Sequence, residues 1–501
     1  MNAPTSPPED GGAGSAEIVR RGRLAMLILG ARAAVLQVLV LVAGVVLARL
    51  LDPKDFGVVA IVQTALAFFA IVGDGGLGAA LIQQKDEPTD EQLASVFYAQ
   101  LALGLVVVAG VFVAAPYVVA RYPSLPPSAV LLLRALSVTF LLGMARAVPS
   151  IKLERQLAFG KLALVDVIGQ LSFYVTVVPF AALGFHELSL VVGAIASALA
   201  GLVTVYALAP YRPRGGLVRG TLGPLFTFGL PFQLKSALSF LNASVTAMYG
   251  GVVLGSARVG LVQKGQETAY FPLKLVEIVG RVGFPLYARM RDDPATLSRE
   301  MTKHVRVCAY GTLYFGSLVL ALGPELLRVL FGPKWVPATP ALQVFSAALV
   351  VGFVSPIVGA ALDALGRPGI FVRLSVVWTT VSWAAVLLTV PLWPDGERVL
   401  GFSIAYASHV VIGNVLVIVV AKRILPDVRV VSTIARPLVP AVVAGLVGRR
   451  FLAPFVAEPL TLALGVLAMA ALFAIGAVLF DRSGAEEVFA FAVKKREGSA
   501  A

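Results

Sequence analysis

Charged and polar side chains interrupt the apolar segment 257–283, and their spacing puts them on one face of a helix. At about 100° per residue they share an arc of roughly 80°, which holds Gln263, Glu267, Lys274, Glu277 and Arg281, with Lys264 at its edge. A charge that faces lipid costs about 2.5 kcal/mol or more. The stripe therefore predicts a helix that lines a water-filled path through a membrane.

Two other interpretations of this stripe stay open. Lys274 with Glu277, and Glu277 with Arg281, are i,i+3 and i,i+4 pairs that could neutralise each other. Part of the segment could instead lie at the membrane interface. We favour the cavity because even a paired charge is costly in lipid. Pro272 is predicted to kink or break the helix near its middle.

Further ionisable residues lie in other apolar segments. Lys235 continues a line of polar residues along 223–252, in which Ser239, Asn242 and Thr246 are interpreted as hydrogen-bonding residues between helices. Lys235 itself is assigned to the cavity, although its side chain could also reach the inner surface. Two deep residues, Arg32 and Asp74, are predicted to be functional. Three others are interpreted as reaching toward the membrane surface: Arg134, Arg146 and Asp166.

The composition requires that most of these elements lie in a membrane. The chain has 501 residues, of which 58% are hydrophobic and only 14% are charged. A soluble protein carries about 25% charged residues, so soluble and disordered classes are excluded. The net charge of +13 does not indicate nucleic-acid binding, because the basic residues collect in short loops between apolar segments. The single cysteine excludes an internal disulfide. We find no metal-ligand spacing among the histidines and no nucleotide-binding loop, so no cofactor is expected.

The apolar runs predict an all-α polytopic membrane protein with about fourteen spanning helices. The expected spans are 24–47, 56–82, 93–118, 128–149, 161–183, 188–209, 223–252, 257–283, 305–326, 339–363, 370–392, 399–420, 437–456 and 459–480. The connections are too short for a soluble catalytic domain. The expected organisation is a tail at 1–23, lobes at 24–222 and 223–420, an extra helix pair at 421–480 and a tail at 481–501.

Basic residues predict the orientation of the chain. With the N-terminus inside, the inside segments carry 25 of the 41 lysines and arginines. An even number of spans then puts the C-terminus inside as well. The chain also echoes itself, because Gly57 and Gly260 each follow an apolar run and an outward turn and open the next helix. This echo predicts two parallel six-helix halves.

Several motifs resemble a known family of transporters. Residues 47–86 contain an L-x-P-x-DFG turn followed by D-x-GLGAALIQ. Further matches are FGLPFQLKSALSFLN at 228–242, VGFPLYARMRDDP at 282–294 and FGPKWVPATPALQVF at 331–345. Together they resemble the Wzx-like oligosaccharide-lipid flippases and polysaccharide exporters of the multidrug/oligosaccharidyl-lipid/polysaccharide (MOP) superfamily, in the capsular, colanic-acid and teichuronic-acid branch.

This resemblance implies a two-lobed transporter in the bacterial inner membrane that moves an undecaprenyl-diphosphate-linked glycan between leaflets. Cations suit a diphosphate, and the candidates are Arg32, Lys235, Lys264, Lys274 and Arg281. Three carboxylates either carry a coupling H⁺ or Na⁺ or balance these cations: Asp74, Glu267 and Glu277. Membrane lipids and a polysaccharide polymerase or export machinery are the implied partners; nucleic acid is not.

The sequence departs from the family in the seventh expected span, 223–252. Where the branch usually carries Arg, Asp and Arg, this chain has Ala243, Thr246 and Val252. The leading alternative is a cation-coupled drug or metabolite antiporter of the same superfamily, which should show fewer cavity cations and a dominant acidic site. A membrane enzyme would need a large outward loop, which is missing here, and a scaffold without transport is a further alternative.

Overall fold

A computed structural model describes residues 40–74, 76–84 and 86–488, and this part consists of helices joined by turns, with no strand in it. The first described helix is Val40–Leu50. The next are α2 (Pro53–Asp74), α3 (Leu77–Gln83), α4 (Asp90–Ala120), α5 (Ala129–Arg155), α6 (Phe159–Ala182), α7 (His186–Leu208), α8 (Arg219–Ala243) and α9 (Val245–Val253). The second half holds α10 (Ser256–Ala269), α11 (Leu273–Arg289), α12 (Pro294–Phe331), α13 (Thr339–Gly352), α14 (Val354–Ala364), α15 (Pro368–Thr389), α16 (Arg398–Ile424), α17 (Val430–Phe451) and α18 (Pro459–Phe480), with short 3-10 turns η1 (Pro333–Ala338), η2 (Val390–Leu392), η3 (Asp395–Glu397) and η4 (Ala453–Phe455).

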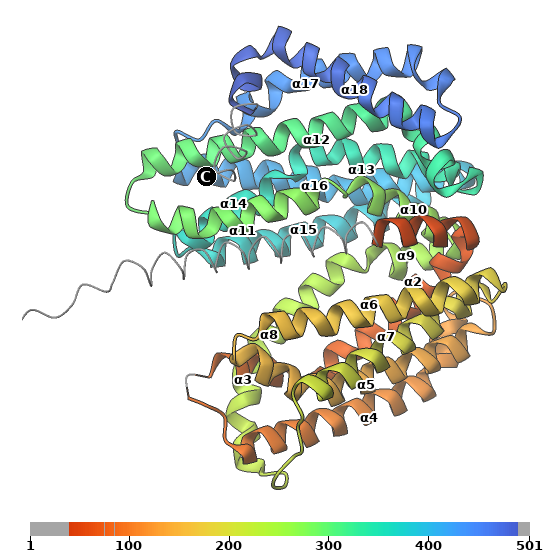
Figure 1. Cartoon of the computed structure of the whole chain (residues 1–501), viewed down its shortest axis with the longest axis vertical. Helices are drawn as coiled ribbons and strands as arrows, with labels where there is room; N and C mark the ends of the chain where they lie inside the picture. The colour runs from red at the N-terminus through yellow and green to blue at the C-terminus, as the bar shows by residue number, and fades with distance from the viewer. Residues whose placement is uncertain (1–39, 75, 85, 489–501) are drawn as a thin grey trace, which may run out of the picture.

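The helices form two bundles that diverge from a common junction (Figure 1). We call the described residues 40–208 the N-lobe and residues 256–488 the C-lobe. Helices α4 to α7 pack on one another in the N-lobe, and α10 to α16 form the body of the C-lobe. The pair α17 and α18 packs on the outer side of α12. Helix α8 runs between the lobes and contacts α3 and α4 on one side and α15 on the other.

Twelve of the described helical segments are long and apolar enough to cross a membrane. The protein is therefore a multi-pass membrane protein. Both members of the C-terminal pair, Val430–Phe451 and Pro459–Phe480, are among the twelve. Two expected spans are not: only the end of span 24–47 lies within the described residues, and span 257–283 is divided between α10 and α11.

Proline and glycine break several of the expected spans. The polar segment 257–283 stops at Ala269 and resumes at Leu273, because Pro272 has no N–H to continue the helical ladder. The predicted break is therefore confirmed, and the stripe of charges is divided between two helices. Span 56–82 is also divided, at Gly76, whose φ of 70° is a left-handed conformation that favours glycine.

Two glycines allow the lobes to meet backbone to backbone. A Cβ atom on Gly57 of α2 would lie 1.7 Å from the carbonyl oxygen of Ser256, and one on Gly260 of α10 would lie 1.9 Å from the carbonyl oxygen of Pro53. The contact is reciprocal, since Pro53 and Ser256 each precede their glycine by four residues. The two glycines of the sequence echo thus face each other across a local two-fold axis.

Hydrogen bonds close the junction at the same end of the molecule. Trp335 Nε1 donates to the Ala48 carbonyl at 2.7 Å, and Arg49 Nη2 donates to the Val329 carbonyl at 2.6 Å. Ser256 N donates to Ser124 Oγ at 2.8 Å. Within the described residues, every hydrogen bond between the two lobes lies in this region, which the basic-residue count predicts to be outward. Toward the opposite end the lobes diverge (Figure 1).

Candidate functional site between the lobes

A pocket of about 290 Å³ lies beside the glycine contact and is lined by both lobes. The N-lobe contributes Gln63 of α2 together with apolar residues of α2, α6 and α7, and α10 contributes Gln263, Lys264 and Glu267. Side chains that can donate and accept hydrogen bonds are thus gathered at the lobe junction of an otherwise apolar protein. The α10 part of the predicted stripe faces the other lobe rather than lipid.

Lys264 has an unusual environment for a charged residue. Its side chain is only 7% exposed, and its Nζ lies 3.0 Å from Glu267 Oε2, while Glu267 is 72% exposed. The ammonium also lies 5.0, 5.3 and 5.7 Å from the ring centres of Phe56, Phe331 and Trp335. Aromatic faces attract cations, most strongly where water is excluded. Because Phe56 belongs to α2 and the other rings to the C-lobe, this aromatic cage joins the two lobes.

Lys274 and Glu277 are not among the described residues that line this pocket. Lys274 and Glu277 are exposed on α11, without an ion-pair partner among the described residues. The buried face of α11 includes Gly280, which approaches Pro356 of α14. The proposed pairing of Lys274 with Glu277 is therefore not made in this structure. Their part in a cavity stays a prediction.

Four further predicted residues are not placed at side-chain level. Arg32 lies outside the described residues. Asp74 ends α2, Lys235 lies within α8 and Arg281 within α11, and the structure describes only these helix positions. Their assignment to substrate binding or charge balance stays a prediction.

The structure adds a polar pocket in the N-lobe that sequence reasoning missed. Arg146 of α5, Gln170 of α6 and Ser197 of α7 line a hollow of about 490 Å³. The guanidinium lies against Gly201, where a Cβ would come within 2.6 Å of Arg146 Nη1. The interpretation of Arg146 as a residue reaching for the membrane surface stays a prediction, but the pocket could not be foreseen, because three helices that are adjacent only in the fold form it. Arg134 lies outside this pocket, and its guanidinium donates to the Phe112 carbonyl instead.

The polar line along α8 and α9 does not form the predicted hydrogen bonds. Asn242 Oδ1 and Thr246 Oγ1 are buried without a partner in the described part of the chain. The contacts between helices are made instead by backbone carbonyls, since Tyr406 Oη donates to the Asn242 carbonyl at 2.9 Å and Trp383 Nε1 to the Leu241 carbonyl at 2.9 Å. Large aromatic side chains of α15 and α16 therefore hold α8. The interpretation of Asn242 and Thr246 as interhelical glue is wrong.

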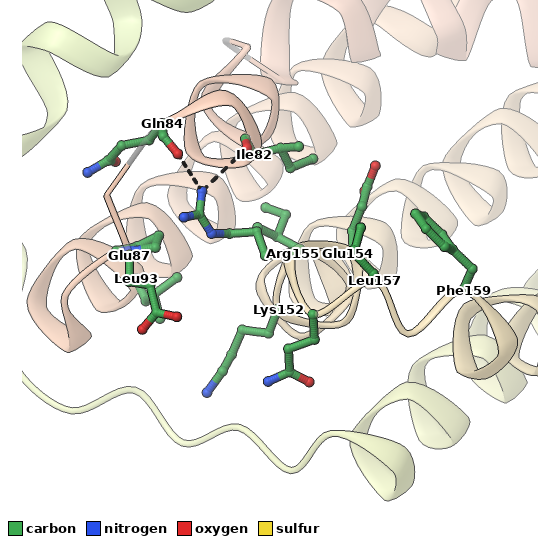
Figure 2. A pocket seen from close by; sticks show the side chains of 12 residues that line it. Ile82, Gln84, Glu87, Leu93, Lys152, Glu154, Arg155, Leu157 and Phe159 are labelled. Atoms are coloured by element: carbon green, nitrogen blue, oxygen red, sulfur yellow. Dashed lines mark hydrogen bonds between the residues drawn. The ribbon is translucent and has the colours of Figure 1, made fainter. Parts of the chain in front are cut away.

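A second N-lobe pocket, at the end where the lobes diverge, lies beside an arginine that holds two helices together. It measures about 610 Å³ and lies beside Arg155 (Figure 2). Arg155 donates to the carbonyls of Leu81, Ile82, Gln84 and Asp86 at 2.7 to 3.3 Å. These bonds satisfy the end of α3 and the turn after it, where carbonyls have no helical donor. Arg155 is thus occupied in holding α3 to α5.

The chain is similar in sequence to proteins of polysaccharide biosynthesis. A family described as "Polysaccharide biosynthesis protein" matches residues 46–340, which is more than half of the chain. The chain belongs to this family. It is 31% identical over 317 residues to the succinoglycan biosynthesis transport protein ExoT of Rhizobium meliloti, a match that covers 62% of each protein. It is 25% identical to the lipopolysaccharide biosynthesis protein WzxC of Escherichia coli, over 70% of this chain and 71% of that one.

Solved structures show the same fold at low sequence identity. The lipid II flippase MurJ matches over 90% of this chain and 98% of its own with a TM-score of 0.73 and 10% identity. An inward-facing multidrug MATE transporter of the MOP superfamily matches over 78% of this chain with a TM-score of 0.58 and 16% identity. The two-lobed fold and the family expected from the sequence motifs are confirmed.

Proposed function

We propose that this protein is a flippase that moves an undecaprenyl-diphosphate-linked oligosaccharide across the bacterial inner membrane by alternating access. Its family and its relatives, which are named for polysaccharide transport and biosynthesis, support this proposal. The observation that carries the mechanism is the lobe junction. One end is closed by glycine contacts and hydrogen bonds, and polar side chains of both lobes lie directly beside the closure.

The substrate chemistry accounts for cations between the lobes. Sugars and a diphosphate cannot enter hydrocarbon, so a carrier must offer polar surface through the membrane. Charge-assisted hydrogen bonds from Lys or Arg hold phosphate oxygens most strongly. In this proposal, exposed Lys274 binds the diphosphate together with Arg32, Lys235 and Arg281, while Glu277 balances its charge or takes up a coupling H⁺ or Na⁺. Lys264 has a different part, since its aromatic cage stabilises the closed end.

The proposed orientation has both termini in the cytoplasm. Most basic residues then lie in cytoplasmic segments, as the positive-inside rule expects. In this orientation the closed end faces outward and the diverging end faces the cytoplasm, where the substrate would be made. Transport of this kind needs rocking of two lobes and no bond chemistry, so we propose no enzymatic activity. Glycan polymerase or export machinery would receive the product.

A deletion of the gene in its native host tests this function. Lipid-linked glycan should accumulate in the inner leaflet of the plasma membrane and disappear from the outer leaflet. Wild type should restore outer-leaflet glycan, whereas Lys274→Ala with Arg281→Ala should restore at most about a tenth of it, because two charged contacts are worth more than about 1.4 kcal/mol together. The measurement is extraction and leaflet-selective labelling of the glycan lipids.

Exposed cations elsewhere in the chain supply the matched control. Lys161→Ala with Arg212→Ala also removes two cations, neither of which lines the lobe junction, and should restore glycan fully. Normal surface glycan after deletion, with a change only in drug tolerance, would overturn the proposal and favour the antiporter. Equal restoration by both double variants would refute the role of the α11 cations.

A further inference from the structure

A cationic pocket lies on the C-lobe, away from the lobe junction. It measures about 920 Å³ and is formed by the start of α12, the end of α16, the turn into α17 and a short helix over 482–488. Its lining contains five cations and two carboxylates: Arg299, Lys303, Arg306, Lys422 and Arg429, with Asp427 and Glu487. The site therefore carries a clear excess of positive charge.

Several of these cations make no ion pair within the described part of the chain. Arg306 pairs with Glu487, and Lys303 Nζ lies 2.6 Å from Glu300 Oε1. The Arg299 guanidinium donates to the Thr296 hydroxyl at 3.0 Å and interacts electrostatically with exposed Asp293, but makes no ion pair among the described residues. Within the described residues, neither Lys422 nor the Arg429 side chain makes an ion pair. Three cations drawn from three different elements thus remain available to one anion.

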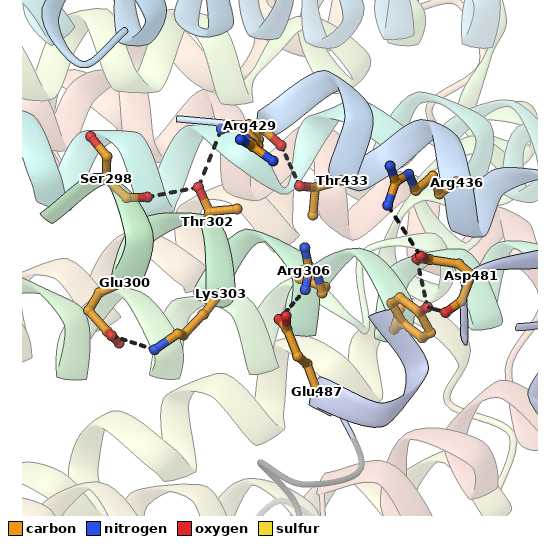
Figure 3. Close-up of polar contacts among 11 residues, drawn as sticks. Ser298, Glu300, Thr302, Lys303, Arg306, Arg429, Thr433, Arg436, Asp481 and Glu487 are labelled. Carbon is orange, nitrogen blue, oxygen red and sulfur yellow. Dashed lines mark hydrogen bonds and ion pairs between the residues drawn. The ribbon is translucent and has the colours of Figure 1, made fainter. Parts of the chain in front are cut away.

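The framework around the pocket is fixed by polar contacts. The Arg429 backbone N–H donates to Thr302 Oγ1 at 3.3 Å, and the Arg429 carbonyl accepts a hydrogen bond from Thr433 (Figure 3). Arg306 ties the 482–488 helix to α12 through Glu487. Tyr310 Oη donates to Asp481 Oδ2 at 2.9 Å and holds the start of that helix. The cations are therefore displayed by a built scaffold rather than by a free loop.

The position of the pocket indicates what kind of anion it binds. Candidate spans end or begin at its edge, at Ile424, Val430 and Phe480, so the pocket lies at the depth of lipid headgroups. An exposed apolar stripe leaves the pocket along one face of α17. It begins at Val431, which lines the pocket, and continues through Val439, Val442 and Leu446, each more than 40% exposed. A phospholipid with its phosphate in the pocket could thus lay its acyl chains along this stripe.

We propose that this pocket binds the phosphate of an anionic phospholipid, with Arg299, Lys422 and Arg429 as its ligands. Basic pockets at the ends of membrane helices suit such headgroups because several cations share one phosphate. The bound lipid would bridge α12, α16 and α17, and so attach the α17–α18 pair to the lobe. The site is separate from the proposed transport path.

The test measures thermal unfolding of the purified full chain with added phosphatidylglycerol, phosphatidylcholine or inorganic phosphate. Phosphatidylglycerol should raise the unfolding temperature of wild type, and the other two should not. Arg299→Gln, Lys422→Gln, Arg429→Gln together should weaken the phosphatidylglycerol response about tenfold or more in lipid concentration. The control Lys161→Gln, Arg212→Gln, Arg214→Gln removes the same charge from exposed positions in α6 and in the connection between α7 and α8, and should respond as wild type.

A charge-keeping variant separates binding from folding. Arg299→Lys, Lys422→Arg, Arg429→Lys should retain the response to phosphatidylglycerol. An equal response of wild type and the glutamine variant would overturn the site. A response to inorganic phosphate that phosphatidylglycerol does not exceed would overturn the lipid as the ligand.

Discussion

Gly57→Ala is expected to abolish transport and to destabilise the closed end of the molecule. The new methyl group would lie 1.7 Å from the Ser256 carbonyl oxygen, and backbone on both sides leaves no flexible side chain to move. Overpacking of this kind costs about 3 kcal/mol, which shifts an equilibrium by about a hundredfold. Gly57→Ala should therefore restore about a hundredfold less outer-leaflet glycan to the deletion strain than wild type does. Gly260→Ala should have the same effect.

Gly110→Ala is the matched control. Gly110 lies within α4, and a Cβ there would meet nothing within 4 Å. This variant should be fully active and slightly more stable, because alanine favours a helix over glycine by about 1 kcal/mol. If Gly57→Ala and Gly110→Ala restored glycan equally, the close approach of α2 and α10 would not be needed for function.

Lys264→Met is expected to weaken closure between the lobes rather than substrate binding. The change removes the ammonium from its aromatic cage and leaves Glu267 without its partner. Desolvated cation–π contacts are worth about 2 kcal/mol, so the population of the closed state should fall by about tenfold or more. The rate of disulfide formation between cysteines at positions 124 and 256 measures this closure.

The rate of crosslinking and the rate of transport, measured together, show whether Lys264 stabilises closure or binds substrate. A gate residue changes the rate of crosslinking and the rate of transport together. A substrate ligand would reduce transport and leave crosslinking unchanged, and that result would refute the gate. Lys264→Met combined with Glu267→Gln should recover part of the closure, because the unpaired carboxylate is then neutral.

Much of the fold could be predicted because its signals are local. Long apolar runs gave the helices, and Pro272 lacks the N–H that a continuous helix needs. The echo of Gly57 and Gly260 was visible as a short motif, but their contact was not, since it depends on how two segments that are 203 residues apart pack together.

The site was predicted less well because its properties depend on neighbours from distant segments. Spacing identified Lys264 as a charged residue on a polar face. Its burial is due to Phe56, Phe331 and Trp335, which no helical periodicity connects to it. The pocket beside Arg146 was not predicted for the same reason, since it is formed by three helices. The spacing within one segment predicts which charges lie in the membrane, but not which side chains surround them.

A reversible lock of the lobe junction tests the central claim most directly. Ser124 and Ser256 hydrogen-bond across the closed end, so Ser124→Cys with Ser256→Cys, in a Cys308→Ala chain, places two thiols there. The purified protein would be reconstituted in vesicles with a fluorescent polyprenyl-diphosphate-linked oligosaccharide. Exchange of this lipid between leaflets should stop on oxidation and resume on reduction, while either single cysteine variant stays active. Unchanged exchange with the crosslink verified by mass spectrometry would contradict alternating access between these lobes.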